Sequence, residues 1–260
     1  MVRLHGNAPY KYVLVHGGPG AVGSLRGFAE ELSRSSKEGV VEAIQSKYSI
    51  DGLIEELYRQ IRENCTDRVF LIGHSWGAWL SVLTAERYPE VVEAMPLVGC
   101  PPLEEEDVPE IISRRLKNLQ GEAREVFQRL LDNRADDEDM KRLPAVLEQA
   151  DNCCIDKKNI YSMGKTDGKM YNSVWNEAAK LRADGKLPES FKKAGNAGSR
   201  ICLIQGACDP HPADGVIRPL EKNHVKCEAY ILDQCGHSPF MEKYAKEEFY
   251  KIIQKIGKKR

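Results

Sequence analysis

A short apolar run that leads into Gly-His-Ser-Trp-Gly at residues 73–77 constrains this chain more than any other feature. Residues 68–72 are typical of a buried strand, and residues 78–87 have the composition of a helix. The pattern G-x-S-x-G between a strand and a helix indicates a sharp turn that lifts a serine hydroxyl above the sheet, because the small flanking residues leave room for the strained backbone. We therefore predict that Ser75 is a nucleophile. The backbone N–H of Trp76, at the start of the helix, is then available to a developing oxyanion.

Strand-like and helix-like segments alternate along most of the chain. Short apolar runs typical of strands are found at residues 10–15, 40–44, 68–72, 92–98, 200–204 and 227–232. Apolar residues with helical spacing lie between them, as at residues 50–61, and a final helix is expected over residues 241–256. This alternation predicts an α/β fold, with a mostly parallel sheet and helices on both of its faces.

The pattern changes after residue 102. Residues 103–198 are rich in charged side chains, show helical spacing in several stretches and contain no convincing strand. We therefore predict a helical cap at 103–198, inserted into an α/β core that consists of residues 1–102 and 199–260.

A second glycine-rich turn follows the first apolar strand. Residues 16–20 read His-Gly-Gly-Pro-Gly, and glycine lets the backbone approach a substrate closely. A tetrahedral intermediate needs two hydrogen-bond donors that are fixed in advance, and one of them commonly comes from such a loop. We predict that Gly18 supplies the second donor beside Trp76. An ordinary tight turn is the alternative interpretation.

A nucleophilic serine needs a base and a carboxylate that orients the base, and in folds of this kind they follow the serine in the order acid, then histidine. Two strand ends remain late in the chain. Asp209 follows the strand at 200–204, and His237 follows the strand at 227–232. Ligands bind at the carboxyl ends of parallel strands, so we predict Asp209 as the acid and His237 as the base.

Other residues of the same types are weaker candidates. Asp214 and Asp233 are the alternative acids, and Asp233 precedes His237 by only a few positions. Among the histidines, we expect His74 to support the turn of the serine and His16 to organise the glycine-rich loop. We expect His224 to lie at the surface, and His211, although close to Asp209 in sequence, lacks the position expected of a base. The remaining histidine is His5.

Composition excludes several classes of function. The formal net charge is −1, with 38 basic and 39 acidic side chains, which argues against nucleic acid as a main partner. We also predict no association with a membrane, because no stretch approaches the roughly 18 apolar residues of a membrane helix. The beginning of the chain lacks the apolar segment of a signal peptide, so we expect a cytoplasmic protein whose eight cysteines are reduced. The cysteine spacing does not indicate a metal site, and we predict no metal and no other cofactor.

Together these motifs resemble the α/β-hydrolase superfamily, from about Tyr10 to the end of the chain and apart from the cap. The pairing of residues 16–20 with residues 75–77 resembles more specifically the proline iminopeptidase branch, cytosolic enzymes that remove an N-terminal residue from short peptides. The resemblance implies that Ser75, Asp209 and His237 are the nucleophile, the acid and the base.

The resemblance also raises expectations about the less typical parts of the chain. Iminopeptidases bind the free amine of the substrate with acidic residues of the cap, and Glu177 is our candidate for this substrate-binding role. Few residues precede the first predicted strand, so the opening pair of strands of the family is expected to be truncated or absent. Residues 44–49 replace the Asp-Gln-Arg-Gly-like loop that commonly follows the second strand.

Three functions follow from these observations, in order of preference. The first is a serine hydrolase with acyl-enzyme chemistry, acting as an aminopeptidase on small molecules or short peptides. The second is a carboxylesterase or thioesterase for small acyl substrates. The third is a lyase or a ligand receptor that uses the same pocket without hydrolysis. The sequence gives no information on the oligomeric state.

Overall fold

The sheet of this protein has seven strands in the order β1-β3-β2-β4-β5-β6-β7 in a computed structural model that describes residues 1–156 and 167–258. β1 pairs antiparallel with β3, and all the other neighbouring strands are parallel. The strands are β1 (Val2–His5), β2 (Tyr10–Val15), β3 (Gly39–Ala43), β4 (Val69–His74), β5 (Val92–Val98), β6 (Arg200–Gly206) and β7 (Cys227–Leu232).

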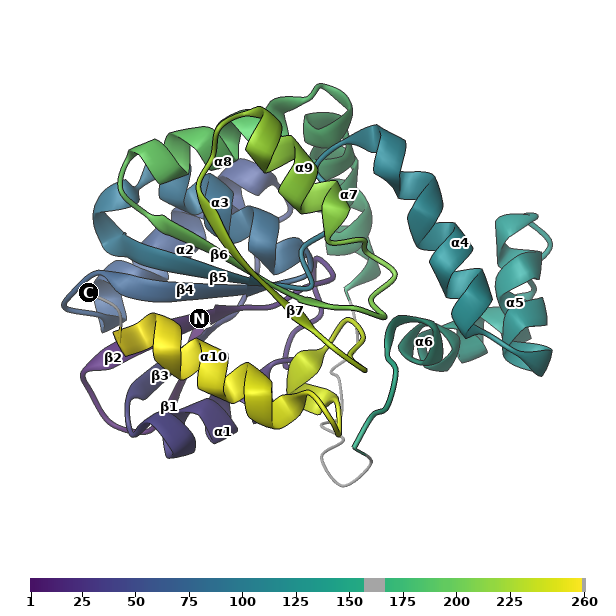
Figure 1. Ribbon diagram of the computed structural model, residues 1–260, viewed down its shortest axis with the longest axis horizontal. Helices are drawn as coiled ribbons and strands as arrows, with labels where there is room; N and C mark the ends of the chain where they lie inside the picture. Colours follow the sequence, from purple (N-terminus) through teal and green to yellow (C-terminus); the bar gives the residue numbers. More distant parts are fainter. Residues whose placement is uncertain (157–166, 259–260) are drawn as a thin grey trace.

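Helices connect most of the strands and cover both faces of the sheet (Figure 1). In the first half of the chain they are α1 (Arg26–Ser36), α2 (Ile50–Asn64), α3 (Trp76–Arg87), α4 (Val108–Asn118) and α5 (Gly121–Leu131). In the second half they are α6 (Asp137–Asp151), α7 (Gly168–Ala183), α8 (Lys186–Asn196), α9 (Asp214–Lys222) and α10 (Lys246–Lys258). Short 3-10 turns occur at Pro89–Val91, Glu105–Asp107 and Pro239–Met241.

Alternating side chains of the central strands divide the core into two layers. On β2, Val13 and Val15 pack with residues of α2, α3, α8 and α9, whereas Tyr12 and Leu14 point the other way and pack with α1 and α10. Successive side chains of a strand point to opposite faces, so a strand that is apolar throughout must be covered on both sides. The predicted α/β fold, with a mostly parallel sheet and helices on both faces, is confirmed.

The helices that follow β5 do not all lie at the same place. Figure 1 shows α4, α5 and α6 projecting to one side of the sheet, while α8 lies on the sheet beside α3. The projecting helices have a small apolar cluster of their own, formed by Leu119, Val126, Phe127, Val146 and Ala150. The boundaries 103–198 for a cap stay a prediction, and α8 at the end of this segment packs with the core layer.

One short strand precedes the first strand that the sequence predicts. Of β1 only Val2 contributes to the apolar core, as a partly buried residue, so the strand lacks the strong alternation that would reveal it. Arg3 and His5 instead reach the buried carboxylate of Glu42 on β3, at 3.0 and 3.4 Å. A single antiparallel strand therefore stands where we expected the opening pair to be truncated or absent.

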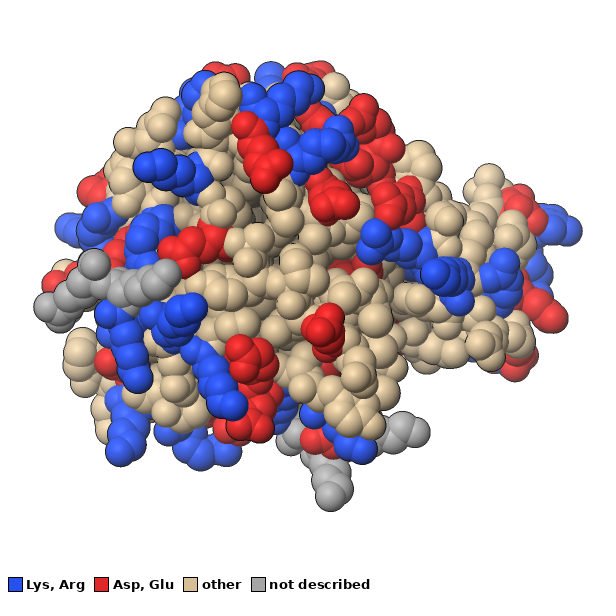
Figure 2. Space-filling model, viewed as in Figure 1, with Lys and Arg blue, Asp and Glu red and all other residues tan. Residues whose placement is uncertain are grey.

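The surface carries both signs of charge. Figure 2 shows basic and acidic side chains interspersed on the face turned toward the viewer, in agreement with the nearly balanced composition. Among the described residues, no helix is both long and apolar enough to cross a membrane. All eight cysteines carry free thiols.

Candidate active site

Ser75 lies on a strained turn between β4 and α3. Its φ of 55° and ψ of −126° are rare for a residue other than glycine, and such strain persists only where the surroundings enforce it. The N–H of Ser75 donates to the carbonyl oxygen of Val98 at 2.9 Å, which fastens the turn to β5. A Cβ on Gly73 would overlap the backbone of Gly77, and one on Gly77 would overlap the backbone of Val15. The two glycines of the motif are therefore required by close packing of the backbone.

The loop at residues 16–20 lies directly against this turn. A Cβ on Gly17 would be 2.9 Å from the Cβ of Ser75, so the backbone of the loop packs directly against the serine side chain. Gly18 has a φ of 96°, which only glycine adopts without strain. Trp76 is the first residue of α3, and the N–H groups of a helical first turn have no acceptor within the helix. The predicted donors thus come from two segments that meet beside Ser75.

Gln45 joins these two segments, a role that the sequence did not reveal. Its Nε2 donates to the carbonyl oxygen of His16 at 2.7 Å, and its Oε1 accepts from the indole Nε1 of Trp76 at 3.2 Å. The N–H of Gln45 also donates to Nε2 of His16 at 3.3 Å. The loop that departs from the family pattern therefore holds the glycine-rich loop to the start of α3.

Asp209 and His237 meet at the end of the sheet, as their positions after β6 and β7 predict. Nδ1 of His237 lies 3.0 Å from Oδ2 and 3.2 Å from Oδ1 of Asp209, and Asp209 is fully buried. The alternative acids Asp214 and Asp233 are exposed. Among the described residues, no hydrogen bond joins Ser75 to His237; bonds of this kind often tighten only when substrate binds.

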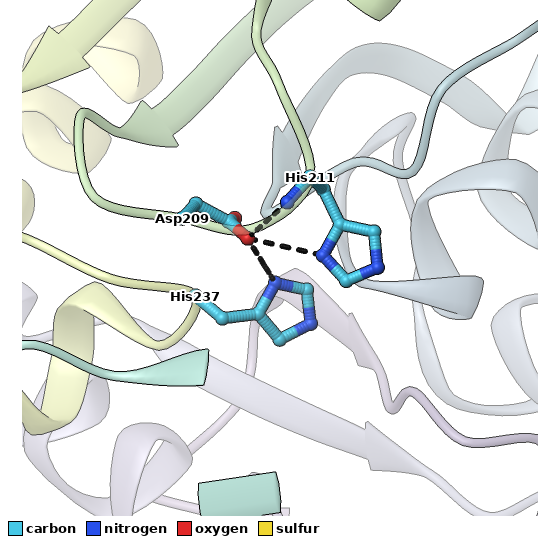
Figure 3. Close-up of side chains that lie close together, drawn as sticks. All are labelled: Asp209, His211 and His237. Carbon is cyan, nitrogen blue, oxygen red and sulfur yellow. Dashed lines mark hydrogen bonds and ion pairs between the residues drawn. The ribbon is translucent and has the colours of Figure 1, made fainter. Parts of the chain in front are cut away.

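His211 is a second imidazole on the same carboxylate. Its Nδ1 lies 3.0 Å from Oδ1 of Asp209, and its ring centre is 4.5 Å from that of His237. Figure 3 shows the two rings on one side of Asp209, each with a nitrogen directed at the carboxylate. His211 is one of the weaker candidates for the base from its position in the sequence, because only the turn after Asp209 brings its ring back to the acid.

The electrostatics of this group distinguish the two histidines. Burial by itself would raise the pKa of Asp209, but the charges and hydrogen bonds of His237 and His211 bring it well below its ordinary value. Burial lowers the pKa of His211, and the charge on His237 lowers it further. Burial also disfavours the charged form of His237, yet the charge and the hydrogen bond of Asp209, together with the charge of Asp151, outweigh this effect and raise the pKa of His237 above 6.5. A proton that enters the group is therefore held by His237.

Two residues from the middle of the chain shape the surroundings of His237. Nε2 of His74 lies 3.0 Å from the carbonyl oxygen of His237, and the ring of His74 is 4.8 Å from the imidazole of His237. Gly99 directly follows β5 and has a φ of 58°, and a Cβ there would be 2.8 Å from Nδ1 of His237. The imidazole is therefore packed between the serine turn and the end of β5.

The helices after β5 contact the same group. The N–H of His237 donates to the carbonyl oxygen of Asp151 at 2.7 Å, and the Asp151 carboxylate forms a two-bond pair with Arg115 of α4 at 2.6 and 2.9 Å. Nη1 of Arg114 donates to the carbonyl oxygen of Asp209 at 3.2 Å. The loops of the acid and the base are thus held by α4 and α6.

The profile of the α/β-hydrolase fold matches residues 13–244 of this chain, which include every residue of the site. The chain belongs to the α/β-hydrolase family. No protein with a curated description matches the sequence.

Solved structures of other α/β hydrolases have the same fold. VinJ superposes with a TM-score of 0.70 at 16% identity, over 98% of this chain and 93% of VinJ. The proline iminopeptidase of Mycobacterium smegmatis gives 0.62 at 14% identity, over 98% of this chain and 93% of that one. The monoacylglycerol lipase of Paleococcus ferrophilus gives 0.60 at 18% identity, over 98% and 97%. At these identities the likeness shows the fold alone.

Glu177, the predicted substrate-binding residue of this α/β hydrolase, forms a contact between helices. Its Oε2 accepts from the N–H of Ile50 at 2.8 Å, at the first turn of α2. Carboxylates are stabilised at helix N-termini, because the unpaired N–H groups and the helix dipole are positive there. Glu177 thus ties α7 to α2, and its contact with a substrate amine stays a prediction.

In the part of this hydrolase that the structure describes, two groups of side chains bring possible metal ligands together. One is Asp209 with His211 and His237, where each Nδ1 is already directed at a carboxylate oxygen. The other consists of Glu104, Glu106 and Asp107, which pair with Arg218. Hydrogen bonds and ion pairs within the protein account for both arrangements.

Proposed function

We propose that this α/β hydrolase is a serine hydrolase that works through an acyl-enzyme. Ser75 is the nucleophile, His237 the base and Asp209 the acid that orients it. The observation that carries this proposal is the buried contact of 3.0 Å between Nδ1 of His237 and Oδ2 of Asp209, at the edge of the sheet where Ser75 occupies its strained turn. The carboxylate only accepts hydrogen bonds, so Nδ1 of His237 carries the hydrogen and Nε2 is free to act as the base.

The proposed reaction has two halves. Oγ of Ser75 attacks the carbonyl carbon while Nε2 of His237 takes its proton, and the N–H groups of Gly18 and Trp76 stabilise the oxyanion. The tetrahedral intermediate collapses, the leaving group receives the proton from His237, and the acyl group stays on Ser75. A water molecule then attacks the ester with His237 again as the base, His237 returns this proton to Oγ of Ser75 as the ester bond breaks, and the acid product is released. These steps need no metal and no organic cofactor.

Within this chemistry we propose an aminopeptidase acting on short peptides or similar small molecules. The support is the pairing of the His-Gly-Gly-Pro-Gly loop with the serine turn, together with the presence of a proline iminopeptidase among proteins of similar structure. A carboxylesterase or thioesterase is the alternative, and a lipase is also among the similar structures. The free thiols agree with a reducing compartment, and we propose a cytoplasmic location.

A comparison of substrates tests both levels of the proposal. Proline and alanine arylamides, which have a free amine, are assayed beside nitrophenyl esters, with the wild-type protein and with Ser75→Ala. We expect hydrolysis of an arylamide by the wild type and none by the variant. Turnover of esters alone would exclude the peptidase, and equal rates for wild type and Ser75→Ala would exclude the serine mechanism.

A further inference from the structure

The carboxylate of Asp209 makes more hydrogen bonds than the orientation of one imidazole requires. Oδ1 accepts from the backbone N–H of His211 at 2.9 Å and from Nδ1 of His211 at 3.0 Å. Oδ2 accepts from Nε2 of Gln205 at 2.9 Å and from Nδ1 of His237 at 3.0 Å. Asp209 and Gln205 are fully buried, so each of these bonds is made where water does not compete.

His211 is itself held in place by this group. Nε2 of Gln205 donates to its carbonyl oxygen at 2.7 Å and also reaches Oδ2 of Asp209. His211 is only 8% exposed, and its ring lies beside that of His237 with an angle of 32° between the two ring planes. The imidazole of His211 therefore has one position, and in that position its Nδ1–H points at the acid.

One carboxylate cannot serve two charged imidazoles equally well. The charged or titratable groups that face His237 are Asp209 and His211 from the loop after β6, His74 from the serine turn, and Asp151 and Arg115 from the helices after β5. Asp151 and Arg115 are bound to each other and largely compensate in charge. The stability of the charged imidazole of His237 therefore depends mainly on how much of the Asp209 charge is available to it.

We propose that His211 is a positioning residue of this site, whose Nδ1–H fixes the Asp209 carboxylate in the orientation that serves His237 and withdraws part of its charge. The inference rests on the proposed function, in which His237 is the base. His211 touches neither the nucleophile nor the reacting carbonyl in this scheme. It acts by holding the acid and by keeping His237 from becoming too basic.

Two substitutions separate this role from simple packing. His211→Leu removes the N–H that reaches Asp209, whereas His211→Asn keeps an N–H at nearly the same distance from the backbone. A hydrogen bond to a charged group is strong enough that its loss should lower kcat about ten- to a hundred-fold, with KM little changed. Because His237 then receives more of the Asp209 charge, the acid limb of kcat/KM moves to higher pH, by about half to one unit. His211→Asn should restore both values toward those of the wild type.

A second measurement does not depend on activity. The imidazole Cε1–H resonance of His237, assigned by its loss in His237→Ala, is titrated by NMR in the wild type, His211→Leu and His211→Asn. We expect the pKa of His237 to rise in His211→Leu and to return in His211→Asn. The exposed His224 provides a control, since His224→Leu should leave the pKa of His237 and kcat unchanged.

The outcomes distinguish this inference from the proposed function. A pKa of His237 that is unchanged or lower in His211→Leu overturns the positioning role, whether or not any substrate is hydrolysed. Activity that survives in His237→Ala but is lost in His211→Leu would make His211 the base and overturn the inference as well. The proposed function fails if neither the wild type nor any variant hydrolyses a substrate or reacts with a serine-directed probe. In that case the NMR titration of His237 still decides the role of His211. Should His211→Leu not fold, His211→Phe keeps a flat aromatic ring at this position without the N–H.

Discussion

His74 donates a hydrogen bond from Nε2 to the backbone carbonyl oxygen of His237 across 3.0 Å, although 163 positions separate them in the sequence. A carbonyl oxygen only accepts, so Nε2 of His74 carries the hydrogen. This bond joins the turn of the proposed nucleophile to the loop of the proposed base. The two loops are therefore placed relative to each other by a neutral, buried histidine.

The buried His74 should make the fold sensitive to acid. Burial, reinforced by the charge on His237, lowers the pKa of His74 to about 3. In the unfolded chain the ordinary value near 6.5 applies, so the unfolded state binds an additional proton as the pH falls below about 6.5 and stability is lost down to about pH 3. His74→Gln keeps a hydrogen-bond donor but cannot be protonated in this pH range. It should therefore reduce the slope of the unfolding free energy against pH by up to about 1.4 kcal/mol per pH unit.

Denaturant unfolding at several pH values between neutrality and the mildly acidic range measures this effect. His224→Gln, a change at an exposed histidine, is the control and should follow the wild type. Identical pH slopes for His74→Gln and the wild type would contradict a neutral His74 in the folded protein.

The activity of the enzyme should rise with pH through the pKa of His237. Burial opposes the imidazolium, but Asp209 outweighs it and raises the pKa of His237 above 6.5. The base must be neutral to accept the proton of Ser75, so the acid limb of kcat/KM should lie above pH 6.5. A profile of kcat/KM against pH measures this directly. A limb clearly below 6.5 would mean that another group is the base.

Gln45 should matter for catalysis, although it is distant in sequence from Ser75, Asp209 and His237 of the proposed triad. Gln45→Leu removes the bonds to His16 and Trp76 that hold together the two segments with the proposed oxyanion donors. We expect a loss of about 1–3 kcal/mol in unfolding free energy and a fall in kcat of about ten-fold or more. Gln60→Leu is the matched control, because Gln60 is about as buried as Gln45 and its side chain, among the described residues, bonds only to the Ile44 carbonyl. It should lose stability with little change in kcat; equal kcat values for the two variants would refute the role of Gln45.

Gly99 should tolerate no side chain, for a reason that concerns His237. Gly99→Ala places a Cβ 2.8 Å from Nδ1 of His237 and strains a backbone with a φ of 58°. Gly185→Ala imposes a similar strain at a φ of 66° but meets nothing within 4 Å. Both variants should lose stability, and only Gly99→Ala should also lose most of its activity. Steady-state kinetics beside thermal unfolding separates the two effects, and an active Gly99→Ala enzyme would count against the packing described for His237.

The six parallel strands could be predicted because each is a short apolar run that ends in a turn. β1 could not, since Val2–His5 is short, half exposed and held by ion pairs with Glu42. Within the segment 103–198 that was predicted to be helical, α6 and α8 were not delimited individually, and each contains a proline, at Pro144 and Pro188, which in sequence indicates a break. Proline in the first turn of a helix needs no N–H acceptor, and Pro188 occupies such a position.

For the proposed site, sequence position pointed to the residues that follow strand ends, namely Ser75, Asp209 and His237. Sequence position could not identify His211, because the direction of a side chain two residues beyond Asp209 depends on the turn between them. It could not identify Gln45 either, whose partners lie in two other segments. The contact of Glu177 with the start of α2 likewise depends on how α7 packs on the core. Side-chain contacts between distant segments were thus the part that required the structure.

Covalent labelling of Ser75 tests the central claim most directly. The wild-type protein is treated with a fluorophosphonate, which reacts with an activated serine, and the modified peptide is identified by mass spectrometry. The account predicts one adduct, on Ser75, that is absent in Ser75→Ala and strongly reduced in His237→Ala. An adduct on another residue, or equal labelling of the wild type and Ser75→Ala, would contradict it.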